Sequence, residues 1–348
     1  MSFFNWAVTF SSASTTSSGV PLWAGRLLRQ ALCTSLVLTY ALSPAQATQI
    51  AGGQTLRLVA PSAAGGTVDA LARLVAQTMS EELGQSMVVE NKPGASGIIA
   101  SETVAHARPD GTVLLIGSVQ THGINPSLHK QLPYDAKKDF VPIGLLASTE
   151  NVLMVNPRSP YGNLAELVQA ARQEPGHITM GTGGNGTSGH LSGVRLEMMG
   201  GVQLVHVPYK GGALAVNDLI GGQIDMVFDS LPSALSLIQT GKLRALAIPS
   251  QVRSASLPNV PTFIEAGYAG FESYGWCILF APAGTPAEVV ETLNAAMNRA
   301  LQNPEVRSRL AKMEFQTRGG TPEEARTYME SEINKWADLV QQSGASAN

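Results

Sequence analysis

The chain has 348 residues, of which 44% are hydrophobic and 14% are charged, and its formal net charge is -3. This length and apolar content suit one large domain or two ordinary ones, while the charged fraction is well below the usual quarter. The sequence has no basic stripe, RNA-binding motif or arginine-rich tail, which argues against a nucleic-acid partner.

The first 47 residues have the composition of a secretory signal. They contain no Asp or Glu, and Arg26 and Arg29 precede an apolar run at 31–42 that is too short to span a bilayer. The segment ends in an Ala-Gln-Ala motif, which predicts cleavage after Ala47. Removal of these two arginines from the 23 basic residues leaves 21 against 26 acidic ones, a net charge of about -5. Any binding of an anion must therefore depend on local groups.

The chain has two cysteines, and Cys33 lies within the predicted signal. Cys277 then stands alone, so no internal disulfide is expected, and we predict a buried structural cysteine. The residues before Cys33 do not resemble a lipoprotein box.

Short apolar runs alternate with segments of helical spacing after the signal, which favours an α/β fold with a mostly parallel sheet covered by helices. The expected strands lie at 56–60, 87–90, 113–117, 152–155, 178–181, 204–207, 226–229 and 243–248. The expected helices lie at 67–83, 164–173, 189–199, 213–220 and 233–239. From residue 285 onward the pattern is helical. The stretches Thr285-Pro286-Ala287-Glu288 and Thr321-Pro322-Glu323-Glu324 are both typical of a capped helix start.

The segment 56–76 joins the first expected strand to the first expected helix through a loop without charged side chains. The first amides of a helix lack backbone partners and carry a partial positive charge. The N–H groups of Ala63, Ala64, Gly65, Gly66 and Thr67 are therefore predicted to bind a carboxylate.

A second loop of this kind occupies 177–193, and its residues 181–186 match G-x-G-x-x-G. The next strand carries His206 where a dinucleotide site needs an acidic residue for the ribose. We therefore predict a smaller anion and no cofactor, with a purely structural loop as the alternative. Two such loops, far apart in the sequence, suggest two domains that face each other across one small ligand.

Several side chains near these loops could carry other chemistry. Ser188 and His190 invite a comparison with hydrolases, but no G-x-S-x-G elbow surrounds Ser188, and the six histidines show no metal-ligand spacing. We expect neither an enzyme nor a metal site. His190 is either a hydrogen-bonding residue near the loop or a core histidine. Asp229 ends a strand, where it either binds a ligand or caps the next helix. Tyr209 also follows a strand and is predicted to line the cleft.

Eight short motifs occur in order along the chain: PSAAGGTVD at 61–69, VENKPGA at 89–95, PDG at 109–111, INP at 124–126, LPYD at 132–135, HVPYKGG at 206–212, LPNVPT at 257–262 and FAPAGTP at 280–286. With them the chain resembles the tripartite tricarboxylate transporter receptors, the TctC or Bug family of periplasmic solute-binding proteins, from Thr55 to Val340. Their order and spacing together make the resemblance specific.

The resemblance implies a two-lobed, flytrap-like periplasmic binding protein of type II, with a mostly parallel sheet in each lobe and two crossovers between the lobes. Lobe 1 would comprise 48–149 and 273–348, and lobe 2 would comprise 150–272. Such a receptor is a periplasmic monomer that holds a mono-, di- or tricarboxylate between its lobes and delivers it to TctA/TctB-like membrane subunits. Use in sensing rather than uptake is an alternative, as are a secreted hydrolase and a dehydrogenase.

The resemblance also implies where the ligand's carboxylates lie: against the loop after the first strand and the Gly/Ser/Thr loop of lobe 2, with the residues after the third strand as a third wall. Relatives commonly have an aromatic residue in place of Ser62, and this smaller hydroxyl predicts a larger or more polar carboxylate. The predicted ligand-binding residues are Ser62, Ala63, Ala64, Gly65, Gly66, Thr67, Asp69, Ser118, Gln120, His122, Thr182, Gly183, Asn185, Gly186, Thr187, Ser188, His190, Tyr209 and Asp229.

Overall fold

The computed structural model describes residues 50–347, and the predicted signal and its cleavage site lie outside this range. The strands are β1 (Leu56–Ala60), β2 (Met87–Asn91), β3 (Val113–Ser118), β4 (Phe140–Val155), β5 (Thr179–Thr182), β6 (Val205–Pro208), β7 (Met226–Ser230), β8 (Arg244–Ala247), β9 (Tyr274–Pro282) and β10 (Gln316–Gly319). The α-helices are α2 (Thr67–Leu83), α3 (Ile98–Ala105), α4 (Asn125–Leu128), α5 (Leu164–Gln173), α6 (Ser188–Gly200), α7 (Gly212–Gly221), α8 (Leu231–Gln239), α9 (Ala287–Gln302), α10 (Pro304–Lys312) and α11 (Pro322–Ser343). Short helical turns occupy η2 (Ile50–Gly53), η3 (Ala95–Gly97) and η4 (Val119–Ile124).

The strands form one mixed sheet in the order β2-β1-β3-β9-β4-β7-β5-β6, with β8 and β10 also paired to β4. The pairs of β1 with β2 and β3, and of β5 with β6 and β7, are parallel, as expected for strands joined by helices. The pairs that involve β4 or β9 are antiparallel. The expectation of a mostly parallel sheet is thus corrected to a mixed one, because β4 and β9 run against their neighbours.

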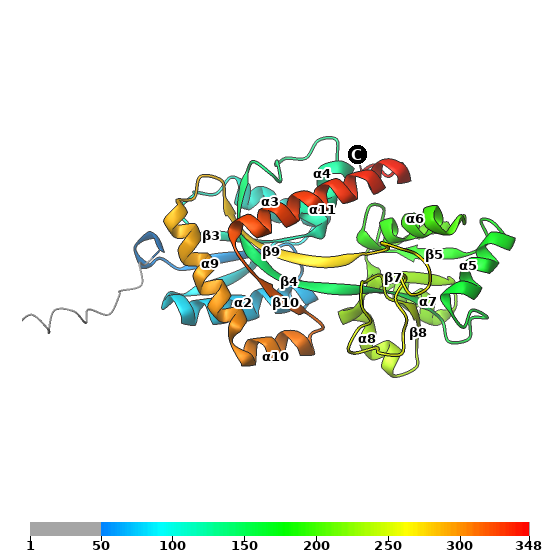
Figure 1. Ribbon diagram of the computed structural model, residues 1–348. Coiled ribbons are helices and arrows are strands. Elements are labelled where there is room, and N and C mark those ends of the chain that lie inside the picture. The colour runs from blue at the N-terminus through cyan, green and yellow to red at the C-terminus, as the bar shows by residue number, and fades with distance from the viewer. Residues whose placement is uncertain (1–49, 348) are drawn as a thin grey trace, which may run out of the picture. The chain divides into compact units, whose positions relative to one another are not determined.

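Strands β4 and β9 are long and run through the middle of the described part of the chain (Figure 1). They pair with each other from Phe140↔Pro282 to Glu150↔Tyr274. Beyond this ladder, β4 continues and pairs with β7 and β8. One end of β4 is therefore part of the sheet with β1, β2 and β3, and its other end is part of the sheet with β5, β6 and β7.

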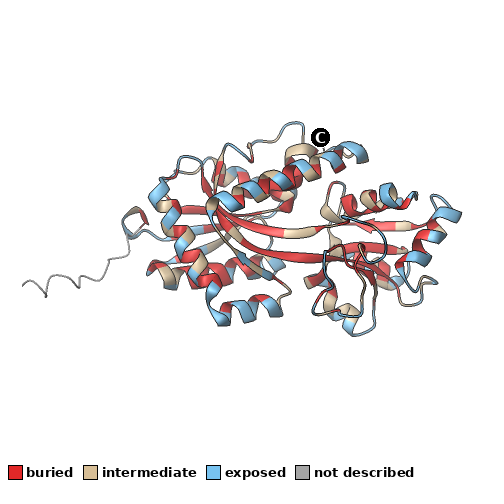
Figure 2. Ribbon diagram, in the orientation of Figure 1, coloured by how far each residue is buried: buried red, intermediate tan, exposed pale blue. Residues whose placement is uncertain are grey.

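Helices cover both faces of the sheet on each side of this central pair, and buried residues follow the strands throughout (Figure 2). In β1, Leu56 and Leu58 pack with α2 and α9, whereas Val59 packs with α3 and α11. In β4, Leu153 packs with α5 and α6, whereas Val152 packs with α7 and α8. This alternation arises because successive side chains of a strand point to opposite faces. Each half of the sheet therefore has one apolar layer on each of its two faces.

The two expected capped helix starts have different outcomes. The hydroxyl of Thr321 accepts from the N–H of Glu324, whose carboxylate in turn accepts from the N–H of Thr321, so α11 begins with a capping box. At α9 the prediction is wrong: the cap position is Pro286, without a side-chain bond. The Thr285 hydroxyl donates instead to the carbonyl of Pro282 at 2.8 Å, which closes the turn before the helix.

The sequence prediction missed β9 and β10 and most of β4, and the helical expectation after residue 285 is wrong at β10. Strand β9 is buried along nearly its whole length and reads as a continuous apolar run, which periodicity cannot assign. Strand β10 has the polar sequence QTRG and forms by pairing with β4. Between residues 50 and 347, no helix is both long and apolar enough to cross a membrane.

Candidate functional site

A cavity of about 220 Å³ lies where the start of α2 and the ends of β3 and β7 meet the middle of β4 and the start of β9. None of the residues that line it carries a charged side chain. Polar groups come from the first turn of α2, the end of β3, β4 and the start of α8, while β9 and the residue before β10 contribute apolar surface. The lining residues are Thr67, Val68, Ser118, Val119, Thr149, Ser230, Pro232, Gly275, Trp276, Cys277 and Phe315.

The cavity coincides with the positions at which lobe crossovers are predicted. Thr149 pairs with Gly275 and Glu150 pairs with Tyr274, so the predicted boundaries at 149/150 and 272/273 lie beside each other across the β4–β9 ladder. An added Cβ at Gly275 would lie 2.4 Å from Oγ1 of Thr149. Only glycine therefore leaves room for the Thr149 hydroxyl in its present position.

Several hydrogen-bond donors at the cavity have no partner within the described residues 50–347. They include the N–H groups of Thr67 and Val68 in the first turn of α2, whose cap residue Gly66 has no side chain to satisfy them. The hydroxyls of Thr67 and Thr149 also lack partners, although Thr149 is only 7% exposed. Since the start of α2 also carries a partial positive charge, these donors can bind an oxyanion.

Asp69 fixes the loop before α2. The residue is 3% exposed, and its Oδ2 accepts from the N–H of Gly65 at 2.8 Å and from Nε of Arg73 at 3.0 Å. Its Oδ1 accepts from Nδ2 of Asn91 at 2.8 Å. The hydrogen bond from Arg73, followed by that from Gly65, lowers the pKa of Asp69 from 3.8 to about 2. Asp69 thus binds its own loop, and it occupies the Gly65 amide that was predicted to hold the ligand.

The rest of the first loop lies beside the cavity without lining it. The N–H of Gly66 donates to the carbonyl of Ala63 at 3.3 Å, and Ala63 and Ala64 are exposed. Oγ of Ser62 is buried without a hydrogen-bond partner, while the Ser62 carbonyl accepts from Nδ2 of Asn91. The Ser62 hydroxyl therefore supplies no donor to the cavity, and the structure does not support the expectation that Ser62 selects a larger or more polar carboxylate.

The predicted third wall is partly formed. Ser118, whose Oγ caps η4, lines the cavity together with Val119. Nε2 of Gln120 donates to Oδ1 of Asn125 at 2.8 Å. His122 is fully buried and stacked on Phe280 with ring centroids 4.2 Å apart, and burial lowers its pKa to about 3. Because its side chain is fully buried and does not line the cavity, His122 is a packing residue.

None of the predicted residues between Thr182 and His190 lines the cavity. Several donors in this loop bind acceptors in the same loop. The N–H of Gly184 donates to Oγ1 of Thr182 at 3.3 Å, and that of Gly186 donates to Nδ1 of His190 at 3.2 Å. Oγ1 of Thr187 caps α6 by accepting from the N–H of His190, and it donates to the carbonyl of Gly184 at 2.8 Å. Gly183 packs against Gly212, and Asn185 is exposed.

The second loop does contact the half of the structure that contains α4. A Cβ at Gly186 would lie 2.2 Å from Cδ2 of Leu128 in α4, so the two chain segments are in close contact. Gly186 also has a φ of +73°, which favours glycine. The loop is therefore held against α4, a helix of the predicted lobe 1.

Ser188 and His190 do not form the pair that a hydrolase needs. No hydrogen bond joins their side chains in the described part of the chain, and Nδ1 of His190 already accepts from Gly186. Burial, followed by the nearby His206, lowers the pKa of His190 to about 4. His190 thus meets both descriptions, because it is 8% exposed and its ring bonds the loop.

Tyr209 and Asp229 also lie outside the cavity lining. The Tyr209 hydroxyl donates to Oδ2 of Asp218 at 2.7 Å, and this bond raises the pKa of Tyr209 to about 12. Oδ1 of Asp229 accepts from the N–H of Ser230 at 2.8 Å, just before α8, and burial raises the pKa of Asp229. The cap position of α8 is Ser230, and no side chain caps this helix, so Asp229 neither caps α8 nor lines the cavity, whereas its neighbour Ser230 does line it.

Sequence reasoning missed the residues that β4, β9 and the position before β10 bring to the cavity, and the contact of α11 behind its wall. Trp276 is 2% exposed and donates from Nε1 to Oε2 of Glu332 at 2.9 Å. Trp336 donates to the same oxygen at 3.0 Å, and Nζ of Lys335 lies 2.6 Å from Oε1. Glu332 thereby fixes the indole of Trp276 in the cavity wall. No local motif marks this contact, since its partners are far apart in the sequence.

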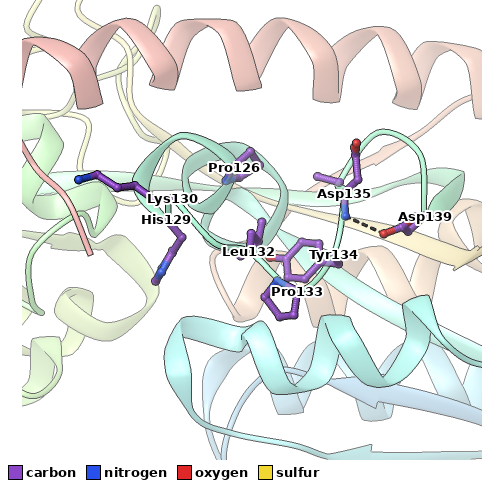
Figure 3. Close-up of a pocket in the computed structure, with 9 residues that line it drawn as sticks. Pro126, His129, Lys130, Leu132, Pro133, Tyr134, Asp135 and Asp139 are labelled. Carbon is purple, nitrogen blue, oxygen red and sulfur yellow. Dashed lines mark hydrogen bonds between the residues drawn. The ribbon is translucent and has the colours of Figure 1, made fainter. Parts of the chain in front are cut away.

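A larger hollow of about 640 Å³ lies at the loop after α4 (Figure 3). It is lined by Pro126, His129, Lys130, Leu132, Pro133, Tyr134, Asp135, Ala136 and Asp139. Asp139 accepts from the N–H of Asp135 at 2.7 Å, and the Tyr134 hydroxyl donates to the carbonyl of Thr121 at 2.6 Å. None of the predicted site residues lines this hollow, and its polar groups stabilise the loop. Within residues 50–347, no group of three or more Asp, Glu, His or Cys residues could hold a metal ion.

Comparison with known proteins gives matches over most of the segment from Thr55 to Val340 in which the short motifs lie. Residues 71–345 match the model of the family described as "Tripartite tricarboxylate transporter family receptor". Protein BugT of Bordetella pertussis is 34% identical over 83% of this chain and 89% of its own. The R. palustris protein Rpa4515, solved with adipate, has a TM-score of 0.77 and 35% identity over 84% of this chain and 98% of its own. MatC from Rhodopseudomonas palustris, solved with bound malate, has a TM-score of 0.73 and 35% identity over 82% of this chain and 98% of its own.

Proposed function

Since the chain belongs to the tripartite tricarboxylate transporter receptor family, we propose that its own cavity at the β4–β9 crossover binds a small organic carboxylate for transport. The related proteins Rpa4515 and MatC were solved with adipate and malate, which are both carboxylates. The observation that carries the proposal is the group of unpaired donors around the cavity, at the start of α2 and on β4.

The donors are sufficient for useful affinity. A micromolar dissociation constant corresponds to about 8 kcal/mol, and a charge-assisted hydrogen bond contributes about 1.5–3 kcal/mol, so about four to six donors meet the requirement after ordering costs. The N–H groups of Thr67 and Val68 and the hydroxyls of Thr67, Ser118 and Thr149 provide such a set. The Ser230 hydroxyl is not part of it, because it bonds Oγ of Ser233 at 3.0 Å. A basic side chain is therefore not needed.

Our proposal includes two lobes, 48–149 with 273–348 and 150–272, that close over the ligand. The position of the cavity beside the paired residues Thr149 and Gly275 supports it, since small rotations there would move the two ends of the sheet relative to each other. The contact between Gly186 and Leu128 supports a role for the second loop in closure. In the closed state, exclusion of water would strengthen each hydrogen bond to the ligand.

We also propose where the receptor acts and with which membrane proteins. Residues 1–47 would direct export to the periplasm, where the receptor acts as a monomer, releases its solute unaltered, and docks to TctA/TctB-like membrane subunits. The periplasmic relatives support this location. Use of the same site in sensing remains the second candidate, because solute binding is common to both roles.

Titration calorimetry and thermal unfolding of residues 48–348 with a panel of carboxylates test the proposal. One carboxylate should bind, and at 100 times its dissociation constant it should raise the free energy of unfolding by about 2.7 kcal/mol. Replacement of Thr67 by valine removes a cavity hydroxyl with little change of shape and should weaken binding about tenfold.

Thr292→Val is the matched control, because the Thr292 hydroxyl lies on the exposed face of α9 and bonds only its own helix. This variant should bind as the wild type does. The proposal fails if no carboxylate binds, or if the two variants have the same affinity.

A further inference from the structure

We propose that the solute of this chain is a carboxylate with one negative charge and an apolar body, such as an aliphatic or aromatic monocarboxylate. The inference rests on the proposed function, since it concerns the ligand of the same cavity. Three properties of the lining carry it: its apolar surface, its lack of basic side chains, and its small volume.

The apolar surface forms most of the cavity wall. Trp276, Cys277 and Phe315 are each at most 5% exposed and are joined by Val68 and Val119. The polar edge of Trp276 is turned away from the cavity, because its N–H donates to Glu332. Burial raises the pKa of the Cys277 thiol to about 12, so the thiol is uncharged. A ligand hydroxyl against this wall would lose its water without gaining a partner.

The charges around the cavity favour a single anionic group. None of the lining residues is Lys, Arg or His, so the positive end of α2 is the main source of attraction for an anion. Ser230 and Pro232, which line the cavity at the start of α8, are uncharged as well. A second carboxylate would therefore have no basic partner among the lining residues.

One hydroxyl marks where the carboxylate belongs. Thr149 is 7% exposed as a whole residue, lines the cavity, and its hydroxyl has no hydrogen-bond partner within the described residues. The Thr149 hydroxyl is therefore a donor that a ligand in the cavity can use. The cavity volume of about 220 Å³ is below the roughly 300–1,000 Å³ of drug-sized sites, so the apolar body must be as small as one ring or a short chain.

Calorimetry with hexanoate, benzoate, adipate, malate and citrate tests the inference. Hexanoate or benzoate should bind at least tenfold more tightly than malate and citrate. If malate, citrate or adipate binds as tightly or more tightly, the inference is wrong and the receptor function stands. If none of the five binds, the inference is wrong, and the wider carboxylate panel described above decides whether the receptor function stands.

A pair of variants tests whether the wall sets this preference. Cys277→Ser places a hydroxyl on the wall at nearly unchanged volume and should reduce the ratio of monocarboxylate to malate affinity about tenfold. Cys277→Ala keeps the wall apolar and should leave that ratio within about twofold of the wild type. Equal ratios in both variants would overturn the assignment of the apolar wall.

Discussion

Replacement of Glu332 by leucine should lower the free energy of unfolding by about 2–5 kcal/mol, because it leaves two buried indole N–H groups without an acceptor at about 1–3 kcal/mol each. Both Trp276 and Trp336 donate to Oε2 of Glu332, which is 6% exposed. These are the two tryptophans that follow residue 47, so intrinsic fluorescence reports directly on the contact. Chemical denaturation followed by this emission measures the loss.

Glu323→Leu is the matched control. Glu323 lies on the same helix α11 and also has a basic partner three residues on, but its side chain is 80% exposed and the distance to Arg326 is 3.7 Å. The change should alter stability by no more than about 0.5 kcal/mol. Glu332→Gln keeps one acceptor oxygen. Its loss in the free energy of unfolding should lie between those of Glu332→Leu and Glu323→Leu. Equal losses for Glu332→Leu and Glu323→Leu would show that the buried carboxylate does not hold the indoles.

Replacement of Asp69 by asparagine should cost about 2 kcal/mol of stability near pH 7 and weaken carboxylate binding about tenfold, because an amide holds Gly65 and Arg73 less strongly than a carboxylate does. The loop before α2 would then lose its fixed position next to Thr67 and Val68. Unfolding curves and calorimetry of the same preparation give the two values.

The stability difference should depend on pH in a defined way. The folded pKa of Asp69 is lowered from 3.8 to about 2, chiefly by the hydrogen bond from Arg73. A lowered pKa contributes stability that is fully present above the unfolded pKa and is lost as pH falls through the folded one. The difference between wild type and Asp69→Asn should therefore be constant above about pH 5 and shrink between about pH 4 and pH 2. A difference that persists unchanged at pH 2 would contradict the charged contact.

Asp110→Asn is the control for binding. Asp110 also fixes a loop through its carboxylate, accepting from the N–H of Thr112 at 2.9 Å, but it does not line the cavity. This variant should lose stability and retain the affinity of the wild type. An equal loss of affinity in Asp110→Asn would mean that Asp69 affects binding only through overall stability.

Local sequence patterns predicted those elements whose bounds are set by interactions between residues close together in the chain. Helices α2 and α5 begin and end at the predicted residues, since apolar spacing and flanking Gly or Asn residues define them. The bounds of strand β1 were likewise predicted. Strands β9 and β10 were missed, because the first is apolar on both faces and the second forms by pairing with β4.

The candidate site was predicted only where it coincides with a helix start or a strand end. Thr67 and Ser118, two of the predicted ligand-binding residues, line the cavity, whereas Thr149, Gly275 and Trp276 come from strands whose pairing no sequence pattern reveals. The amide of Gly65 was expected to bind the ligand, but Asp69 four residues later takes it. Loop amides in the second segment are satisfied in the same way by Thr182 and His190. The sequence shows donors, but not whether the protein itself supplies their acceptors.

A crystal structure of residues 48–348 with a carboxylate that binds in calorimetry tests the central claim most directly. The account predicts electron density for the carboxylate group within hydrogen-bond distance of the Thr67 and Val68 N–H groups, with the body of the molecule against Trp276. Density in the hollow lined by Lys130 and Asp139, with the cavity at the β4–β9 crossover empty, would contradict it.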